Sequence, residues 1–392
     1  MSAVLVDVSE LLAAPVRTGI QRVVRSLLRH WPAAGQVRLC RFVPGRGLVE
    51  VPDAVLPWLT DATEAARLAA PDTLAQAIGA LLDDAAPSIP PEPPILVPEL
   101  FFDAARCAAH RALLAVDPGR VRFLLHDLIP WLHPELIGVR GVAHLMPYLT
   151  LLRDARMVAF TSQAVRHEFA TRIRRIGLPE GDARQAAALA RVGPVVPLGA
   201  DGPPIPRQKF SAARRTYLCV GSVDGRKNQA AVVAAFRQLW QAGSDARLIV
   251  VGRVFAQMED GADAHALRDL ASDPRFTHLV DIDDTALAAL YGQARATIFA
   301  SHREGHGLPP IEGLRAGVPA IVTAATPSIA DLPPAGQIRL EQPTAAAIAA
   351  AVTLLETDDG AARLWAAAAT QTPPDWSSTA AALANWMSGD AR

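Results

Sequence analysis

The chain has 392 residues, a length that predicts two domains rather than one compact core. With 51% hydrophobic and 20% charged residues, the composition is that of a globular protein and excludes an intrinsically disordered chain. Because 38 basic side chains are balanced by 39 acidic ones, the net charge of −1 excludes a protein whose overall charge attracts nucleic acid.

The cysteines and the N-terminal segment indicate in which cellular compartment the protein is expected. Cys40, Cys107 and Cys219 are far apart, which fits a reducing compartment and excludes a zinc site built on CxxC spacing. The sequence begins without the basic segment and the cleavage site of a secretory signal, and no apolar run is long enough to span a bilayer. We therefore expect a cytoplasmic protein, either free or peripheral on the inner face of the cytoplasmic membrane.

Short apolar runs alternate with amphipathic segments through the first half of the chain. The expected strands lie at 3–8, 95–97, 121–127 and 157–162, and the expected helices at 19–31 and from Gln163 to about Arg175. This alternation is typical of βαβ units with a parallel sheet. An Ala-rich segment (62–86), expected to form one or two exposed helices, precedes a proline cluster (89–94), and we interpret about 50–94 as an insertion.

A proline-rich stretch divides the chain. Residues 201–208, DGPPIPRQ, contain three prolines, which exclude a regular helix or a central strand. We predict a first domain over 1–205 and a second over 209–375. The second domain has expected strands at 216–222, 247–252, 277–282, 296–301 and 319–324, and a helix from about Asn228 to Ala242. A terminal helix over 376–392, after a break at Pro373 and Pro374, would suit a crossing back to the first domain.

Several common nucleotide and hydrolase motifs are missing. The segment after the first expected strand has a single glycine, Gly19, where a dinucleotide-binding protein needs GxGxxG. Lys227 stands between Arg226 and Asn228, outside the GK[ST] context of a phosphate-binding P-loop. The sequence also lacks the HExxH motif of zinc proteases and the GxSxG motif of α/β-hydrolases, so we do not expect a protein of either class.

The segment SHREGHGLPPIEGLRAGVPAIV (301–322) carries the most chemical information. Glu304 and Glu312 lie eight residues apart, on either side of two prolines. Because proline is favoured in the first turn of a helix, we predict a short helix from near Pro309 to Gly317. Glu304 then lies in the preceding loop and Glu312 in the first helical turn.

This segment combines features that suit one kind of ligand. Gly305 and Gly307 let the backbone approach a ligand closely, and the helix N-terminus favours an anion. The two carboxylates can accept hydrogen bonds from hydroxyl groups, so the site suits a nucleotide sugar. In the alternative interpretation, both glutamates face solvent on an ordinary capped helix.

Four segments together resemble one family. EGHGLPPIEGLRAGVPAI resembles the E-x7-E segment of retaining GT-B glycosyltransferases of the family 4 type. Three more segments are similar to other characteristic segments of this family: YLCVGSVDGRKNQAAVVAAF (217–236), LLHDLIPWLHPEL (124–136) and RTGIQRVVRSLL (17–28). The resemblance runs from Asp7 to about Ser328 and implies an α/β protein of the GT-B fold, with two Rossmann-like doubly wound domains facing across a cleft.

The resemblance implies a role for each acid and cation. Glu304 would hold hydroxyls of the donor sugar and Glu312 the nucleoside ribose, while Arg226 and Lys227 would clamp the diphosphate. Fixed cations aimed at a departing diphosphate lower the barrier to its release. An ordinary solvated charge pair is the alternative, but a cation at a helix N-terminus is unfavourable without an anion nearby.

The resemblance also implies contacts from the first domain. His126 would lie beside the donor sugar and the reacting bond, followed by Asp127, the one carboxylate evident near it. The backbone N–H of Gly19 would face the diphosphate. The further substrate-binding residues implied by the matched segments are Ser222, Gly305, His306, Gly307 and Leu308.

Two other segments admit alternative interpretations. VDIDDTALAALY (280–291) contains a possible DxD metal motif, but we favour Asp283 or Asp284 as a helix cap, and the resemblance implies catalysis without a metal or another cofactor. Arg22, Arg25 and Arg29 share one side of the expected helix 19–31. That helix either simply packs on a sheet or rests on an anionic membrane.

We therefore predict a retaining glycosyltransferase that moves a hexose or deoxyhexose from a GDP-, UDP- or dTDP-linked donor to a glycan or lipid-linked acceptor. The resemblance implies a front-face mechanism, a donor held mainly by the second domain, and a place in bacterial surface polysaccharide or lipopolysaccharide synthesis. One alternative is a GT-B-shaped sugar-nucleotide epimerase or hydrolase. Another is a non-catalytic polysaccharide assembly protein.

Overall fold

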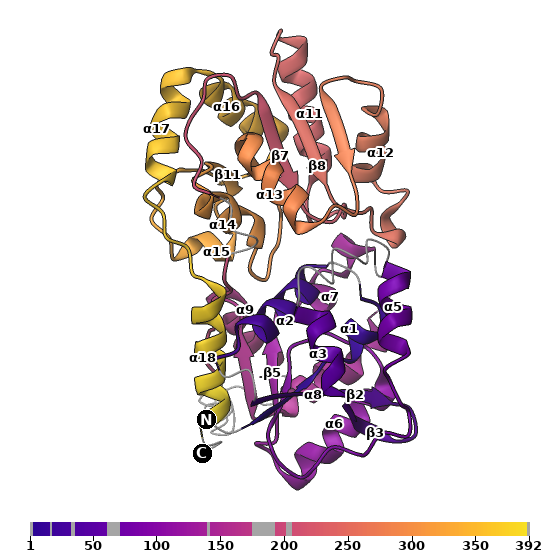
Figure 1. Ribbon diagram of the computed structural model, residues 1–392. Coiled ribbons are helices and arrows are strands. Elements are labelled where there is room, and N and C mark those ends of the chain that lie inside the picture. Colours follow the sequence, from indigo (N-terminus) through magenta and orange to yellow (C-terminus); the bar gives the residue numbers. More distant parts are fainter. Residues whose placement is uncertain are drawn as a thin grey trace. The chain divides into compact units, whose positions relative to one another are not determined.

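The structure is a computed structural model that describes residues 3–15, 18–32, 36–60, 71–138, 142–174, 193–200 and 206–389, apart from the side chains of residues 71, 72 and 74. Contacts divide the chain into two units, and each contains a six-stranded sheet (Figure 1). The first unit comprises Met1–Leu128, Val142–Leu198 and Trp376–Arg392, and the second comprises Ile129–Gly141 and Gly199–Asp375.

The sheet of the first unit has the order β3-β2-β1-β4-β5-β6. Its strands are β1 (Val4–Asp7), β2 (Val37–Val43), β3 (Gly47–Val51), β4 (Ile95–Val97), β5 (Val121–Leu125) and β6 (Met157–Phe160). Neighbouring strands are parallel except β2 and β3, which form an antiparallel hairpin. The four strands expected in this half of the chain are confirmed, whereas β2 and β3 were not anticipated.

Helices connect the strands of the first unit, and others follow β6 or close the chain. They are α1 (Ser9–Ala13), α2 (Gly19–His30), α3 (Leu56–Thr60), α5 (Pro71–Gly79), α6 (Ala104–Val116), α8 (Met146–Asp154), α9 (Gln163–Glu168) and α18 (Trp376–Ser388). The helix expected from Gln163 begins as predicted and changes to a π-helical turn over Phe169–Ile173. Within the expected Ala-rich helical segment, residues 61–70 lie outside the described residues, and α5 follows them.

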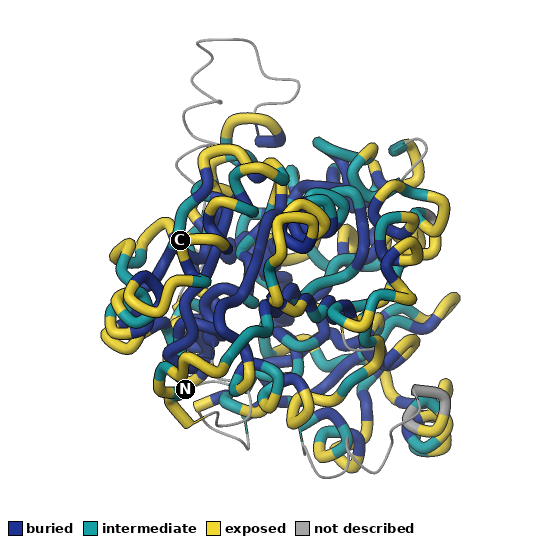
Figure 2. The backbone as a smooth tube through the Cα atoms, turned by 90° about the horizontal axis from the view of Figure 1, so that it is seen from above, coloured by how far each residue is buried: buried dark blue, intermediate teal, exposed yellow. Residues whose placement is uncertain are grey.

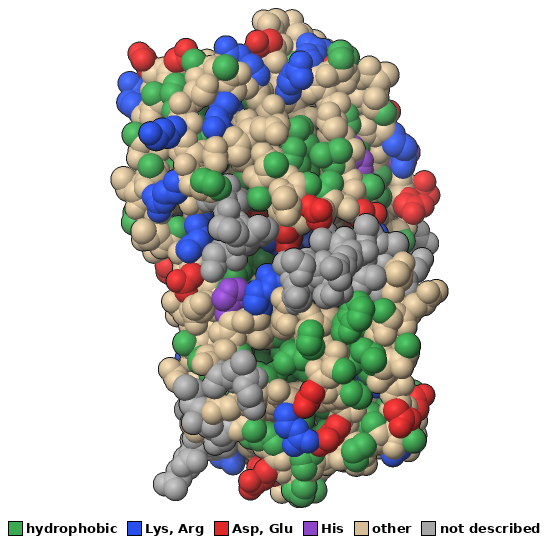
Figure 3. All heavy atoms as spheres, in the orientation of Figure 1, with side chains coloured by type: hydrophobic (Ala, Val, Ile, Leu, Met, Phe, Trp, Pro, Cys, Tyr) green, Lys and Arg blue, Asp and Glu red, His purple; other side chains and the backbone are tan. Residues whose placement is uncertain are grey.

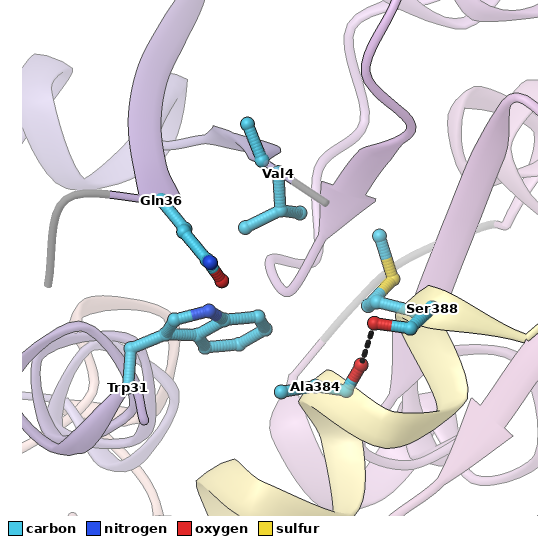
Figure 4. A pocket seen from close by; sticks show the side chains of 7 residues that line it. Val4, Trp31, Gln36, Ala384 and Ser388 are labelled. Atoms are coloured by element: carbon cyan, nitrogen blue, oxygen red, sulfur yellow. Dashed lines mark hydrogen bonds between the residues drawn. The ribbon is translucent and has the colours of Figure 1, made fainter. Parts of the chain in front are cut away.

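Helix α18 packs within the first unit. The hydroxyl of Thr379 donates a 2.8 Å hydrogen bond to the carbonyl oxygen of Pro197, and Arg122 donates one of 2.7 Å to that of Trp386. A hollow remains beside the helix, and Figure 4 shows Trp31 and Gln36 facing Ala384 and Ser388 across it. Its volume of about 10 Å³ accommodates roughly one water molecule, so it is too small for an organic ligand.

The sheet of the second unit has the order β12-β11-β10-β7-β8-β9. Its strands are β7 (Thr216–Val220), β8 (Arg247–Val251), β9 (Phe276–Leu279), β10 (Ala294–Phe299), β11 (Ala320–Thr323) and β12 (Gln337–Leu340), and all neighbours are parallel. The five expected strands are confirmed and β12 is additional. Together the two sheets confirm the predicted α/β fold.

Helices and aromatic side chains complete the second unit. Its helices are α7 (Ile129–Leu132), α11 (Gln229–Gln241), α12 (Ala262–Asp269), α13 (Asp284–Gln293), α14 (Leu308–Arg315), α15 (Pro327–Ala330), α16 (Ala345–Glu356) and α17 (Asp358–Ala368). Phe236 of α11 packs edge-on against Tyr217 and Trp240, with ring centroids 5.6 and 5.7 Å apart. Figure 2 shows the buried residues gathered in the interior and the exposed ones at the outside of the tube.

The contacts assign residues to the two units differently from the sequence in two places, at Ile129–Gly141 and from Gly199 onward. Ile129–Gly141 group with the second unit, although the sequence placed them in the first domain, because Leu136 closely approaches Gly225 after β7. A side-chain Cβ at Gly225 would lie only 3.3 Å from the carbonyl oxygen of Leu136. The predicted boundary at 201–208 falls largely on residues 201–205, which lie outside the described residues.

Two observations concern the surface charge and the polarity of the helices. Acidic and basic side chains are interspersed over the described surface that Figure 3 shows, in keeping with the near-zero net charge. Each helix in the described part of the chain is too short or too polar to traverse a bilayer.

Candidate functional site

The chain reverses its direction of strand addition between β7 and β10. From β7 it adds β8 and β9 on one side, and from β10 it adds β11 and β12 on the other. Because all of these strands are parallel, the loops after β7 and β10 diverge at one edge of the sheet, the place where open α/β sheets bind ligands. These loops contain Arg226, Lys227 and Glu304, which the sequence singled out.

The loop after β7 is organised by Asp224, which is 2% exposed. One carboxylate oxygen accepts hydrogen bonds from the backbone N–H groups of Arg226 and Lys227, at 3.1 and 3.2 Å. The other accepts a 2.7 Å hydrogen bond from the hydroxyl of Ser222. A side chain that binds its own loop backbone in this way sets the direction of the two following cationic residues.

Asn228 ends this loop in a left-handed conformation, with φ of 60°, and α11 starts at the next residue. Its side-chain amide donates to the carbonyl oxygens of Ala300 and Pro343, at 3.2 and 2.8 Å. A further backbone hydrogen bond of 2.8 Å joins the N–H of His302 to the carbonyl oxygen of Arg226. The loops after β7 and β10 are therefore tied together.

Glu304 bridges the two cations. Its Oε1 lies 2.6 Å from Nζ of Lys227, and its Oε2 lies 2.9 Å from Nη1 of Arg226. The side chains of Glu304 and Lys227 are 7% and 10% exposed, and Nζ also lies 4.5 Å from the ring centroid of Phe299. The three residues that the sequence assigned to sugar and diphosphate binding thus form one ionic cluster.

The environment shifts the titration of this cluster. Burial lowers the pKa of Lys227 below its ordinary value, although Glu304 acts to raise it. Burial acts to raise the pKa of Glu304, but Arg226 and Lys227 together hold it below its ordinary value. The carboxylate is therefore ionised at neutral pH, and it provides a negative charge that stabilises both cations.

The E-x7-E segment forms a loop and a helix, as predicted. Helix α14 begins at Leu308, with Gly307 preceding it at φ of 92°, and ends shortly before Gly317 at φ of 79°. A side-chain Cβ at Gly307 would lie 2.8 Å from Cγ2 of Thr326, so this position favours glycine both for its conformation and for its packing.

The position of Glu312 in the helix differs from the prediction. It lies in the second turn of α14 rather than the first, because the helix begins one residue earlier than Pro309. Its side chain is buried, with the residue 6% exposed, and its Oε2 accepts a 2.8 Å hydrogen bond from the hydroxyl of Tyr291. Burial of both glutamate side chains contradicts the alternative in which they face bulk solvent.

The other predicted residues of this unit lie nearby in the chain. Gly305 is buried, and the carbonyl oxygen of the half-buried His306 accepts a 2.8 Å hydrogen bond from the backbone N–H of Ser328. Leu308 is buried as the first residue of α14. Ser222 lies in the loop after β7, where it binds Asp224.

His126 and Asp127 follow directly after β5 in the first unit, at the carboxyl edge of its sheet. His126 is 7% exposed, and its Nε2 lies 2.7 Å from the carbonyl oxygen of Pro98. Burial lowers the pKa of His126 to about 4, so the ring is neutral at pH 7. Because a carbonyl can only accept, Nε2 carries the proton and Nδ1 is the acceptor nitrogen.

The N-terminal segment places Gly19 at the first position of α2. The hydroxyl of Thr18 caps the helix by accepting a hydrogen bond from the N–H of Gln21. Of the three arginines expected on one side of this helix, Arg22 and Arg25 are half-buried and Arg29 is exposed. The helix therefore presents less basic surface than its sequence spacing suggests.

The possible DxD motif is a helix cap. Asp283 accepts a 2.7 Å hydrogen bond from the backbone N–H of Ala286 at the start of α13, which confirms the capping interpretation. Among the residues that the structure describes, no three His, Cys, Asp or Glu side chains converge into a site that could hold a metal ion.

Sequence reasoning missed a buried ionic network in the first unit. The guanidinium of Arg106 lies 2.9 Å from Asp7, 2.9 Å from Glu10 and 3.4 Å from Glu99. Glu99 also accepts hydrogen bonds from two backbone N–H groups at the start of α1. The network lies where the strand order reverses between β1 and β4, and the acidic residue that ends β1 was a signal for it.

A family comparison bears on the second unit. Residues 205–372 match the family model described as "Glycosyl transferases group 1". This match covers the strands, loops and helices that contain Arg226, Lys227, Glu304 and Glu312. The second unit is therefore similar, over most of its length, to glycosyl transferases of group 1.

Curated relatives match more of the chain. The serotype-specific mannosyltransferase WbdA of Escherichia coli is 27% identical over 338 residues, which cover 81% of this chain and 37% of the relative. The chain thus spans little more than a third of the length of the curated relatives it matches.

Solved structures share the fold across the whole chain. Sucrose-phosphate synthase from Thermosynechococcus elongatus has a TM-score of 0.67 and 18% identity, over 98% of both chains. HepE from Anabaena, solved with UDP and glucose, has a TM-score of 0.65 and 14% identity over 100% of both chains. These likenesses confirm the predicted GT-B type of fold, with two Rossmann-like units.

Proposed function

We propose that the chain transfers a hexose or deoxyhexose from a nucleotide-diphosphate sugar to a glycan or lipid-linked acceptor in bacterial polysaccharide synthesis. The observation that carries this proposal is the cluster of Arg226, Lys227 and Glu304 at the strand-order reversal of a unit similar to glycosyl transferases of group 1. A mannosyl donor is favoured among hexoses because the Escherichia coli relatives are named as mannosyltransferases.

The second unit would hold the donor. Arg226 and Lys227 bind the diphosphate, whose charge increases as the bond to the sugar breaks, and fixed cations lower the barrier for such a step. Glu304 accepts hydrogen bonds from sugar hydroxyls and Glu312 from the ribose. The backbone from Gly305 to Leu308, at the start of α14, adds N–H groups that favour an anion.

The first unit would hold the acceptor. His126, followed by Asp127 at the carboxyl edge of its sheet, would lie beside the donor sugar and the reacting bond, and the N–H of Gly19 at the start of α2 would face the diphosphate. The acceptor hydroxyl attacks the anomeric carbon on the face from which the diphosphate leaves, so the configuration is retained. The departing phosphate oxygen takes the hydroxyl proton. The low pKa of His126, about 4 because of burial, makes its ring a weak base, which fits a scheme in which the phosphate accepts the proton.

A peripheral position on the cytoplasmic face of the membrane belongs to the same proposal, because a lipid-linked acceptor is presented there. Sedimentation with vesicles that contain anionic lipid tests this part separately. Replacement of the exposed Arg29 by glutamine should then reduce the bound fraction.

The test of the activity begins with thermal unfolding in the presence of GDP-, UDP- and dTDP-sugars, because a bound ligand raises the midpoint. The stabilising donor is then incubated with and without acceptor glycans. Acceptor-dependent transfer supports the proposal, whereas donor turnover without an acceptor supports an epimerase or hydrolase. Binding without any turnover supports a non-catalytic assembly protein.

Two variants assign the activity to the site. E304A and K227A should each lower kcat by about 100-fold or more, as expected for loss of a charge that stabilises the transition state. D269A is the matched control in the same unit. Asp269 forms an exposed ion pair with Arg237, so this variant should leave turnover unchanged. Full activity in both E304A and K227A would remove this cluster from the mechanism.

A further inference from the structure

The cations of the candidate site are already neutralised by carboxylates of the same chain. Arg226 and Lys227 carry two positive charges, and Asp224 and Glu304 carry two negative ones. Asp224 is bound to the backbone of its own loop and is therefore a fixed part of it. Glu304 comes from a different loop and reaches both cationic groups through its side chain alone.

Glu304 therefore occupies the hydrogen-bonding positions of the cations that a diphosphate would use. Its two oxygens accept from Nζ of Lys227 and Nη1 of Arg226, as two phosphate oxygens would. A diphosphate can take these same N–H groups only if the carboxylate gives them up. Since the cluster is largely buried, the competing charges are only weakly screened by solvent.

We propose that Glu304 is an internal counter-ion that the donor displaces and that returns to the cations once the sugar has been transferred. This inference rests on the proposed function. While the nucleotide sugar is intact, sugar hydroxyls donate to the displaced carboxylate and stabilise it. After transfer these hydroxyls leave with the product glycan, and the carboxylate competes with the nucleoside diphosphate for Lys227 and Arg226.

The consequence is a site that discriminates between donor and by-product. The intact donor offers the carboxylate new partners, whereas the free nucleoside diphosphate offers none. The negative charge of Glu304 therefore weakens the binding of the by-product and speeds its release. A carboxylate that only bound sugar would have no effect on the affinity for a diphosphate without sugar.

The test uses inorganic pyrophosphate, which lacks both sugar and ribose, in titration calorimetry with the full chain. In E304Q the side chain keeps its size but loses its charge, and pyrophosphate should bind about tenfold more tightly, a typical coupling between two charged groups. E312Q is the matched control, because Glu312 is a buried carboxylate of the same segment that binds Tyr291. Its affinity for pyrophosphate should stay within about twofold of the wild type.

Thermal unfolding adds a second readout. Without ligand, E304Q should unfold at a lower temperature than the wild type, because two buried cations lose their shared partner. Pyrophosphate should then raise its midpoint by more than it raises that of the wild type. If E304Q does not fold, E304D serves instead, because its shorter side chain cannot reach both cations. The E304D variant should therefore also bind pyrophosphate more tightly than the wild type.

The outcomes separate the two proposals. Failure of wild-type protein to bind pyrophosphate, GDP, UDP and dTDP would overturn the proposed function together with this inference. If the wild type binds them and E304Q binds pyrophosphate equally or more weakly, the counter-ion inference alone is wrong. Tighter pyrophosphate binding and stronger inhibition of E304Q turnover by the nucleoside diphosphate support it.

Discussion

The side-chain amide of Asn228 donates a 2.8 Å hydrogen bond to the carbonyl oxygen of Pro343, which lies 115 residues further along the chain. Its second bond, to Ala300, connects the same turn to the end of β10. Because Asn228 directly follows Arg226 and Lys227, these bonds position the cationic turn relative to the loop that contains Glu304.

Asn228 should be replaceable by glycine at lower cost than by alanine. N228G loses both side-chain hydrogen bonds and should be destabilised by about 1–3 kcal/mol. N228A loses the same bonds and also pays about 1 kcal/mol for a side chain at φ of 60°. Urea unfolding of the two variants measures the difference, and equal midpoints would show that the left-handed conformation imposes no cost.

Arg106 should be essential for the stability of the first unit. R106M leaves the carboxylate of Asp7 buried without its cation and removes the guanidinium contact of Glu99, so it should cost about 3–5 kcal/mol. R111M, on the same helix, removes an exposed pair with Asp154 and should cost less than about 1 kcal/mol. Chemical denaturation compares the two, and similar losses would refute a special role for the buried network.

The buried network should also make stability depend on pH. Burial raises the pKa of Glu99 to about 8, although Arg106 acts to lower it. The folded protein thus holds this proton more tightly than the unfolded chain, and stability should fall as pH rises from about 5 to about 8. The shift of Asp7 has the opposite sign, because Arg106 and His110 hold its pKa well below the ordinary value against the effect of burial. Its contribution should be lost only in strong acid.

E99Q isolates the contribution of Glu99. The amide cannot titrate, so the decline in the free energy of unfolding between pH 5 and 8 should be smaller than in the wild type. The variant should also be less stable at pH 5, because the amide nitrogen cannot accept a hydrogen bond from a backbone N–H, as either oxygen of the carboxyl group does at the start of α1. An unchanged slope would show that Glu99 is ionised throughout this range.

Gly307 should tolerate substitution far less well than Gly19. G307A places a methyl group 2.8 Å from Thr326 and forces alanine to φ of 92°, so it should cost more than about 2 kcal/mol. G19A meets no atom within 4 Å and lies in the first turn of a helix, so it should be neutral or slightly stabilising. Thermal unfolding of the two variants provides the comparison.

The sequence by itself determined most of the strands and the local course of the candidate site. Buried strands of a parallel sheet are continuous apolar runs, so β4 and β6 are evident from composition alone. The prolines and glycines of the E-x7-E segment determine where α14 begins and ends, because they restrict the backbone locally. The strands that were missed, β2, β3 and β12, include an edge strand of each sheet and contain polar residues that interrupt the apolar pattern.

Only the tertiary structure decided which charged groups meet. Lys227 and Glu304 are 77 residues apart, and they pair because β7 lies beside β10, an adjacency that hydrophobic periodicity does not specify. The network around Arg106 likewise joins Asp7 to a helix 99 residues away. Periodicity records whether a residue is buried, whereas the partner of a buried charge depends on strand order and on the loops that strand order brings together.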